Sequence, residues 1–209
     1  MKISYAVTVC NELTEISKLL PFLMENKREK DEVVVFFDSC NGTKQVEDYL
    51  RASSQETYAK FRWMAYHFDG HFAHMKNALT EACLGDYIFQ IDADEMVSKE
   101  FMEMLPEILE SNQVDVLRVP RINTVSGLTT EHVRKWGWSL NDKGWVNFPD
   151  YQWRIYKRTP TIKWKNKVHE VLEGYQIMAN LPALEEYCLL HHKDIARQEK
   201  QNQLYSTLS

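Results

Sequence analysis

Hydrophobic and polar positions along the first half of the chain alternate between two kinds of segment. Segments rich in apolar, β-branched and aromatic residues predict strands at 3–9, 31–38, 61–68 and 86–92. Segments with apolar positions three or four residues apart predict helices at 12–24, 44–60 and 72–85. Strands that alternate with helices and are apolar on both faces are typical of a parallel sheet covered by helices. We therefore expect an α/β fold with a mostly parallel central sheet.

The second half of the chain is less regular. An amphipathic helix is expected at 98–111 and a strand at 115–125. We interpret residues 126–150 as a loop or flap, because their glycines and tryptophans follow no clear period. Segments 151–158 and 161–172 alternate with a period of two, like paired antiparallel strands; a further strand is expected at 187–194 and a terminal helix from 195 onward. This half therefore predicts a small antiparallel portion beside the parallel sheet.

Polar side chains follow the predicted strands of the first half, at the point where each strand ends. Asn11 and Glu12 follow the first strand, Asp38 ends the second, and Asp92 ends the fourth. His67 and Asp69 lie at the end of the third strand in the same way. Ligands of open parallel sheets bind at the carboxyl ends of the strands. Four strand ends with polar residues therefore indicate one shared site.

The fourth strand ends in the segment Asp92-Ala93-Asp94-Glu95. The alternation of a strand puts Asp92 and Asp94 on one face and Ala93 on the other. Carboxylates this close repel one another unless a cation lies between them, and oxygen ligands suit Mg²⁺ or Mn²⁺. A solvated turn would explain an isolated Asp-x-Asp, but the apolar strand before it and the added Glu95 favour a cation site.

Composition narrows the class of protein. The chain has 209 residues, of which 44% are hydrophobic, and a formal net charge of −5, so one domain is expected and a broad nucleic-acid-binding surface is not. The four cysteines are widely spaced, which fits reduced thiols in a cytoplasmic protein. No stretch approaches the roughly 20 apolar residues of a membrane-spanning helix, although peripheral membrane contact stays open.

Four motifs in order resemble glycosyltransferase family 2, whose members have the GT-A fold. They are "VTVCNE" at the start, "FFDSCNGT" second, "FAHMKNALTEACL" third and "GDYIFQIDADE" fourth. Within the family, "RIYKRTPTIKWKNKVHEVLEG" resembles the segment of lipopolysaccharide-core-type glucosyltransferases that carries a V-H-E motif. The resemblance covers about residues 1–195.

The resemblance implies an activity and a division of the chain. It implies a metal-dependent, inverting transfer of a hexose from a nucleotide-sugar, with a UDP-sugar expected, to a hydroxyl of a glycan or glycolipid. The expected cofactor is Mn²⁺ or Mg²⁺. Within a single GT-A domain, 1–97 would be the nucleotide-sugar-binding half, 98–195 the acceptor-side half and 196–209 a terminal helix.

The resemblance also implies roles for individual residues. The positions expected to bind the nucleotide-sugar are Val9, Asn11, Glu12, Asp38, Lys76, Asn77, Asp92 and Ala93. Among them, Asp38 would read the base and Lys76 with Asn77 would lie near the diphosphate and ribose. Asp38 could equally begin a turn before "SCNGT", and Lys76 could be a solvated surface lysine. Asp94, Asp92, His169 and His191 are the candidates for the metal.

Inversion needs a base that takes the proton from the acceptor hydroxyl. Glu170 of the V-H-E segment is the first candidate and Asp150 the second. In a regular strand His169 and Glu170 would point to opposite faces, so a bulge or a strand end is needed if both face one cleft.

Three tryptophans and an arginine are the candidates for the acceptor side. Trp136, Trp138 and Trp145 lie in the segment 126–150, and indole rings can stack on the apolar faces of sugars. They could instead form a hydrophobic lid on the core. If the resemblance holds, Arg154 would lie near the acceptor or the diphosphate.

Three other functions are weighed against a transferase. A phosphatase with an aspartyl nucleophile should carry Asp-x-Asp at its first strand, but here that motif ends the fourth strand. A sugar-nucleotide pyrophosphorylase should have a glycine-rich loop after its first strand, but "VTVCNELTE" contains no glycine. A catalytically degenerate GT-A module, which binds nucleotide or glycan without turnover, stays as the alternative. Nucleotide binding without turnover would favour that module.

Overall fold

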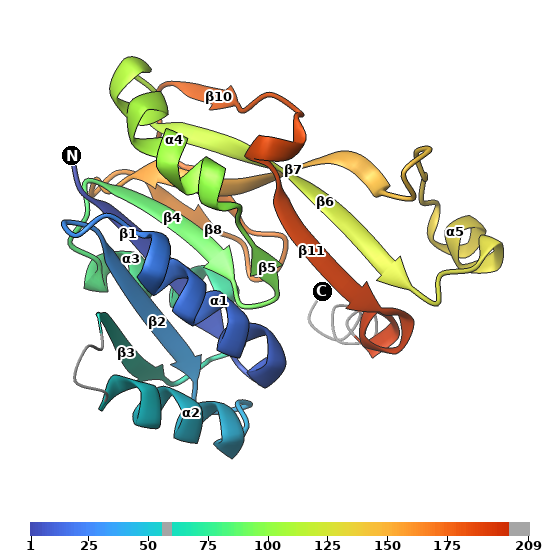
Figure 1. Cartoon of the computed structure of the whole chain (residues 1–209), viewed down its shortest axis with the longest axis horizontal. Helices are drawn as coiled ribbons and strands as arrows, with labels where there is room; N and C mark the ends of the chain where they lie inside the picture. The colour runs from blue at the N-terminus through green and yellow to red at the C-terminus, as the bar shows by residue number, and fades with distance from the viewer. Residues whose placement is uncertain (56–59, 201–209) are drawn as a thin grey trace.

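The structure, a computed structural model, describes residues 1–55 and 60–200. Its strands are β1 (Ile3–Val9), β2 (Glu32–Asp38), β3 (Phe61–Tyr66), β4 (Tyr87–Asp92), β5 (Glu95–Met96), β6 (Val116–Ser126), β7 (Val146–Lys157), β8 (Lys163–Lys165), β9 (Val171–Glu173), β10 (Met178–Asn180) and β11 (Leu189–Asp194). Its helices are α1 (Leu13–Asn26), α2 (Lys44–Ser54), α3 (Phe72–Ala82), α4 (Lys99–Ser111), α5 (Thr130–Trp136) and the short 3₁₀ turn Glu185–Tyr187. Figure 1 shows their arrangement.

The central sheet is mixed and mostly parallel. Its strand order is β3-β2-β1-β4-β7-β6-β11-β5, and β10 also pairs with β6. The pairs among β3, β2, β1 and β4 are parallel, whereas β7 runs antiparallel to both β4 and β6. The predicted fold class, an α/β sheet flanked by helices with an antiparallel portion, is confirmed.

Helices cover both faces of the sheet because the strands are apolar on both faces. One face packs against α1, α2 and α4 and includes Tyr5, Val35 and Phe89. The other packs against α3 and the hairpin of β8 and β9, and includes Ala6, Val34 and Ile88. These residues alternate along each strand, as the period of two requires. The two apolar layers fix the sheet, and with it the edge at which β1, β2 and β4 end.

Segment 126–150, expected to be a loop or flap, contains a helix and the start of a strand. Helix α5 is capped by Thr129, whose side chain accepts a hydrogen bond from the backbone N–H of His132, and it ends at Gly137 with φ 65°. A helix of seven residues is too short to show a helical period in the sequence. Glycine is favoured at the residue after the helix, because that residue has a left-handed backbone conformation. In Figure 1, α5 lies at the end of an arm formed by β6 and β7, away from the helices on the sheet.

The predicted pairing of segments 151–158 and 161–172 is wrong. Strand β7 lies in the central sheet, while β8 pairs with β9 in a separate two-stranded sheet. Between β8 and β9, residues 166–170 leave the strand geometry, with positive φ angles at Asn166 (74°) and His169 (55°). Period-two alternation predicted the extended backbone of β7, β8 and β9, but it missed the break at 166–170 and carried no information on the partner strand. The short strands β5 and β10 were not expected, because two or three residues cannot show a period.

Two of the predicted helices extend beyond the residues that the structure describes. The backbone is helical at 195–200, and the rest of the helix expected at 196–209 lies outside the described residues. The last residues of the helix expected at 44–60 include 56–59, which also lie outside them. Within the described ranges, no helix is both long and apolar enough to cross a bilayer.

Candidate functional site

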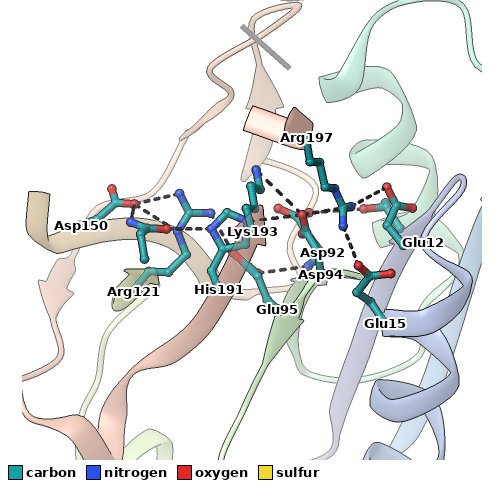
Figure 2. A network of polar contacts seen from close by, with 12 residues as sticks. Glu12, Glu15, Asp92, Asp94, Glu95, Arg121, Asp150, His191, Lys193 and Arg197 are labelled. Atoms are coloured by element: carbon teal, nitrogen blue, oxygen red, sulfur yellow. Dashed lines mark hydrogen bonds and ion pairs between the residues drawn. The ribbon is translucent and has the colours of Figure 1, made fainter. Parts of the chain in front are cut away.

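A cavity of about 1160 Å³ opens at the edge of the sheet where β1, β2 and β4 end. Its lining includes residues that follow β1 and β4 and residues from β6, β7 and β11. Figure 2 shows that charged side chains from these elements converge there. The expectation that several strand ends form one site agrees with this arrangement.

Asp92 and Glu95 are held by one buried arginine. Arg154 of β7 is 3% exposed, and its Nη2 lies 2.5 Å from Asp92 Oδ2 and 2.7 Å from Glu95 Oε1. Burial raises the pKa of Asp92, but Arg154 and the nearby Lys76 outweigh it and lower that pKa to about 2. Asp92 is therefore a carboxylate at neutral pH, and Glu95 is part of an ion-pair network.

Asp94 points away from that network toward β11 and the segment after it. His191 Nε2 lies 3.3 Å from Asp94 Oδ2, and Arg197 Nη2 and Lys193 Nζ lie 3.4 Å and 3.9 Å from the same oxygen (Figure 2). Burial raises the pKa of Asp94, but His191 and the two cations outweigh it and hold it well below its usual range. Burial lowers the pKa of Lys193 and of His191, against the attraction of Asp94.

The protonation of His191 follows from its neighbour Asn123. Asn123 Nδ2 donates to Asp150 Oδ2 at 2.8 Å, so its Oδ1 faces His191 Nδ1, which lies 2.7 Å away. An amide oxygen only accepts, and Nδ1 must therefore carry the proton. In the neutral form that the lowered pKa favours, Nε2 presents a lone pair to Asp94.

The side chain of Glu12 stabilises the loop after β1. Its Oε2 accepts hydrogen bonds from the backbone N–H groups of Cys10 and Asn11, at 2.8 and 3.0 Å, and its Oε1 lies 3.2 Å from Arg197. Burial raises the pKa of Glu12 despite these donors. The side chain of Asn11 is exposed, whereas Val9 and Ala93 are buried, and all three line the cavity.

Asp38 lines the cavity but also builds a turn. Its Oδ1 accepts from the backbone N–H of Cys40 and of Asn41, at 2.8 and 3.1 Å, and its Oδ2 accepts from Asn41 Nδ2 at 2.9 Å. The turn that the sequence offered as an alternative is therefore present. Recognition of a base by Asp38 stays a prediction.

Lys76 and Asn77 follow one another on α3 but have different surroundings. Lys76 is 6% exposed; its Nζ lies 3.2 Å from Glu170 Oε1 and 4.6 Å from the centre of the Trp164 ring. Asn77 clamps Trp164, donating to its carbonyl at 2.9 Å and accepting from its N–H at 2.8 Å. Only Lys76 of this pair lines the cavity, and it is not the solvated lysine that the sequence also allowed.

His169 and Glu170 lie in the loop between β8 and β9, and both line the cavity. The positive φ of His169 (55°) breaks the strand alternation, which removes the conflict between two neighbours that must face one cleft. His169 is exposed, and the side chain of Glu170 is 14% exposed.

Asp150, the second candidate base, is engaged on both oxygens. Its Oδ2 accepts from Arg121 Nη2 and Asn123 Nδ2, each at 2.8 Å, and its Oδ1 accepts from Gln152 Nε2 at 2.7 Å. Burial raises the pKa of Asp150, but Arg121 and the amide donors outweigh it, so the pKa falls below its usual value. A carboxylate held in this way is a weak base.

The three tryptophans lie around α5, and only Trp138 lines the cavity. Trp136 stacks on His132 and contacts Trp138, with ring centres 5.1 and 4.7 Å apart. Trp145 packs against Phe148, with ring centres 4.8 Å apart. The structure thus brings one of the three to the cavity.

Several residues of the site were not found from the sequence. They are Glu95 as an ion-pair partner and Arg121, Asn123, Lys193 and Arg197. One signal was available, since Lys193 follows His191 by two positions in a predicted strand and must share its face. Among residues 1–55 and 60–200, no three His, Cys, Asp or Glu side chains form a group that could hold a metal by themselves.

Comparisons with known proteins identify the family and the fold. The family described as Glycosyl transferase family 2 matches residues 4–186. No curated protein matches the chain. S. aureus TarS 1–349 in complex with UDP-GlcNAc is similar in structure, with a TM-score of 0.65 and 16% identity over 92% of this chain and 59% of that one. TarS 1–349 in complex with UDP gives a TM-score of 0.64 and 15% identity over 100% of this chain and 65% of that one.

A solved structure of a second protein matches a smaller part of the chain. The mannosyltransferase PcManGT from Pyrobaculum calidifontis, in complex with GDP-Man and Mn²⁺, gives a TM-score of 0.50 and 18% identity over 57% of this chain and 35% of that one. At identities this low, the similarity shows that the chain shares the fold of these solved structures. The chain spans less than two thirds of each of these structures.

Proposed function

The chain belongs to glycosyl transferase family 2, and we propose that it is a metal-dependent inverting enzyme that moves a hexose from a UDP-sugar to a hydroxyl of a glycan or glycolipid. One observation carries this proposal: carboxylates, a histidine and cations from separate strand ends converge on a single cavity. TarS was solved with UDP-GlcNAc and with UDP, which supports a uridine nucleotide. The complex of PcManGT with Mn²⁺ supports a divalent metal.

Asp94 and His191 have the chemistry to hold that metal. Neighbouring ligands of an octahedral ion with bonds of about 2.1 Å lie about 3 Å apart, and Asp94 Oδ2 lies 3.3 Å from His191 Nε2. The lone pair of Nε2 faces the carboxylate, an arrangement that a cation between the two would stabilise. Two protein ligands are too few for a closed site but suit a cation that also binds substrate phosphates.

A bound metal would stabilise the negative charge that gathers on the diphosphate as the glycosidic bond breaks. Lys193 and Arg197, which lie within 3.9 Å and 3.4 Å of Asp94 Oδ2, place two further cations beside the same carboxylate. Asp92, fixed by Arg154, would orient the donor through its second oxygen, which lies 3.3 Å from the hydroxyl of Thr8. These side chains would hold the donor in one orientation.

Glu170 is the proposed base. Its Oε1 faces Lys76, and Oε2 would accept the proton of the attacking hydroxyl. Asp150 is less suited, because three donor groups occupy its oxygens and its pKa is lowered. Trp138, on the α5 side of the cavity, would contact the acceptor sugar.

Calorimetric titration tests the proposal. UDP is expected to bind in Mn²⁺ with micromolar affinity, and EDTA or the substitution Asp94→Asn should abolish that binding. Asp48→Asn, on the exposed face of α2, is the matched control and should bind UDP like the wild type. Binding that survives both EDTA and Asp94→Asn would contradict the metal site. Binding without release of UDP from any UDP-sugar would favour the degenerate module.

A further inference from the structure

The hairpin of β8 and β9, whose loop carries Glu170, is hydrogen-bonded to α3. The N–H of Phe72, the first residue of α3, donates to the carbonyl of Lys167 at 3.1 Å. One turn further, Asn77 holds both backbone groups of Trp164. The loop 166–170 is therefore anchored to α3 on its N-terminal side, before its chain reaches Glu170.

Lys76 lies between these two anchors and contacts the loop directly. Its ammonium group is held by the Glu170 carboxylate at 3.2 Å and by the face of the Trp164 ring at 4.6 Å. The side chains of Lys76 and Glu170 are 8% and 14% exposed, so water screens the pair weakly. An ammonium group over an indole face is attracted by the ring quadrupole.

A chain of hydrogen bonds fixes the ring and the backbone of Lys76 together. Trp164 Nε1 donates to the hydroxyl of Tyr156 at 3.0 Å, and that hydroxyl lies 2.6 Å from Thr80 Oγ1. Thr80 Oγ1 donates to the carbonyl of Lys76 at 2.8 Å, so Tyr156 must donate to Thr80. Every donor in this buried chain is used, which makes it rigid.

We propose that Lys76 is a positioning residue that holds the Glu170 carboxylate at the cavity, and that it does not bind the donor diphosphate. This inference rests on the proposed role of Glu170 as the base. The ammonium group of Lys76 faces the Glu170 carboxylate and the Trp164 ring, and the lysine side chain is almost fully buried beneath them. The diphosphate would instead be bound by Lys193 and Arg197, the two cations beside Asp94.

The experiment compares three variants in two measurements that need no acceptor. Lys76→Met removes the charge at similar length, Lys76→Arg keeps it, and Lys163→Met is the matched control. Lys163 also links the hairpin to α3, through Glu81 at 3.0 Å, but this pair is exposed and does not line the cavity. The measurements are amide hydrogen exchange in residues 163–173 and UDP affinity in Mn²⁺.

In Lys76→Met we expect exchange in the loop 166–170 to rise about tenfold, because Glu170 loses its buried partner. UDP affinity should stay within about twofold of the wild type, and Lys76→Arg should restore the slow exchange, because the guanidinium keeps the ion pair and the contact with the ring. Lys163→Met should change neither measurement. Unchanged loop exchange in Lys76→Met, or UDP binding weakened about tenfold, would overturn the inference.

Glu170→Gln separates this inference from the proposed function. It breaks the same ion pair from the other side, so loop exchange should rise as in Lys76→Met, even if the lysine variant folds poorly. Release of UDP from the best UDP-sugar should fall at least about a hundredfold, as for loss of a general base. Undiminished release would remove Glu170 as the base, while slow loop exchange in Glu170→Gln would contradict the positioning role of Lys76.

Discussion

Glu95 Oε1 lies 2.7 Å from Arg154 Nη2, and Glu95 has no exposed surface. The same oxygen accepts from Arg121 Nη1 at 3.0 Å, and Oε2 accepts from the N–H of Asp92 at 3.1 Å. Residues of β4, β6 and β7 thus contact one buried carboxylate of β5; Figure 2 shows Asp92, Glu95 and Arg121 of this group. Removing its charge would leave two arginines without a full counter-ion, and breaking a buried ion pair from one side is strongly destabilising.

Glu95→Gln should therefore lower the free energy of unfolding by about 3 kcal/mol. The matched control is Asp48→Asn, which breaks the exposed pair of Asp48 and Lys44 and should cost less than about 0.5 kcal/mol. Urea unfolding at pH 7 measures both values. A loss below about 1 kcal/mol in Glu95→Gln would show that Asp92 and Asp150 suffice to balance the two arginines.

Glu95 also shows how far the sequence can be interpreted. The pattern of apolar positions predicted β1, β2 and β4 with their ends, because each is a long run buried on both faces. It therefore placed Asp92 and Asp94 at the edge of the sheet. It grouped Glu95 with them as one cation site, since the arginines that bind Glu95 are 26 and 59 residues away and lie in other strands.

The second half of the chain was less predictable for a related reason. Period-two alternation showed that 151–158 is extended, but strand pairing depends on the whole sheet, and β7 pairs with β4 and β6. The role of Asn77 could not be inferred either, because its partner Trp164 is 87 residues away. Local turns, such as that at Asp38, were expected because the donor groups lie within three residues.

Asp115 should contribute stability that depends on pH. It accepts from the N–H groups of Gln176 and Ile177 and from Lys157 Nζ, and these contacts lower its pKa. A carboxyl whose pKa is lower in the folded state stabilises the protein above its unfolded value of about 3.9, and that contribution is lost as the pH falls through the folded value.

Asp115→Asn should therefore lower the free energy of unfolding by about 1 to 3 kcal/mol at pH 7, and the difference from the wild type should shrink below about pH 4. Urea unfolding from pH 7 to pH 3 measures this convergence. Parallel curves over that range would mean that the hydrogen bonds of Asp115 do not depend on its charge. Asp48→Asn, whose carboxylate is exposed, serves again as the control.

Asn123 should control metal affinity without binding the metal. Its Oδ1 accepts from His191 Nδ1, which keeps the lone pair of Nε2 on the side of Asp94. Asn123→Leu should weaken Mn²⁺ binding in the presence of UDP by about ten- to a hundredfold, as expected when the hydrogen-bond partner of a ligating histidine is lost.

Calorimetry with Mn²⁺ at saturating UDP checks this expectation, and Asn180→Leu is the control. Asn180 also accepts from a side chain, that of Arg118, but it lies on β10 and does not line the cavity. Equal Mn²⁺ affinity in Asn123→Leu and the wild type would argue against His191 as a ligand.

Arg197 should oppose metal binding in the absence of nucleotide. It reaches from the segment after β11 to Glu15 at 2.7 Å, to Glu12 at 3.2 Å and to Asp94 at 3.4 Å. A divalent cation that approaches Asp94 meets the charge of Arg197 beside that of Lys193, and like charges a few ångströms apart repel by on the order of a kcal/mol even when partly screened. A nucleotide diphosphate would give both side chains an anion to bind and would remove this opposition.

Arg197→Gln should therefore raise the Mn²⁺ affinity of the nucleotide-free protein by about three- to tenfold, and it should lower the factor by which UDP enhances Mn²⁺ binding. Electron paramagnetic resonance of free Mn²⁺, with and without UDP, measures both quantities. Arg51→Gln is the control, because Arg51 pairs only with Glu47 on the exposed face of α2 among the salt bridges of the described residues. The opposite result, weaker Mn²⁺ binding without UDP in Arg197→Gln, would mean that Arg197 orders Glu12 and Asp94 for the metal, and its position between three carboxylates would then serve to assemble the site.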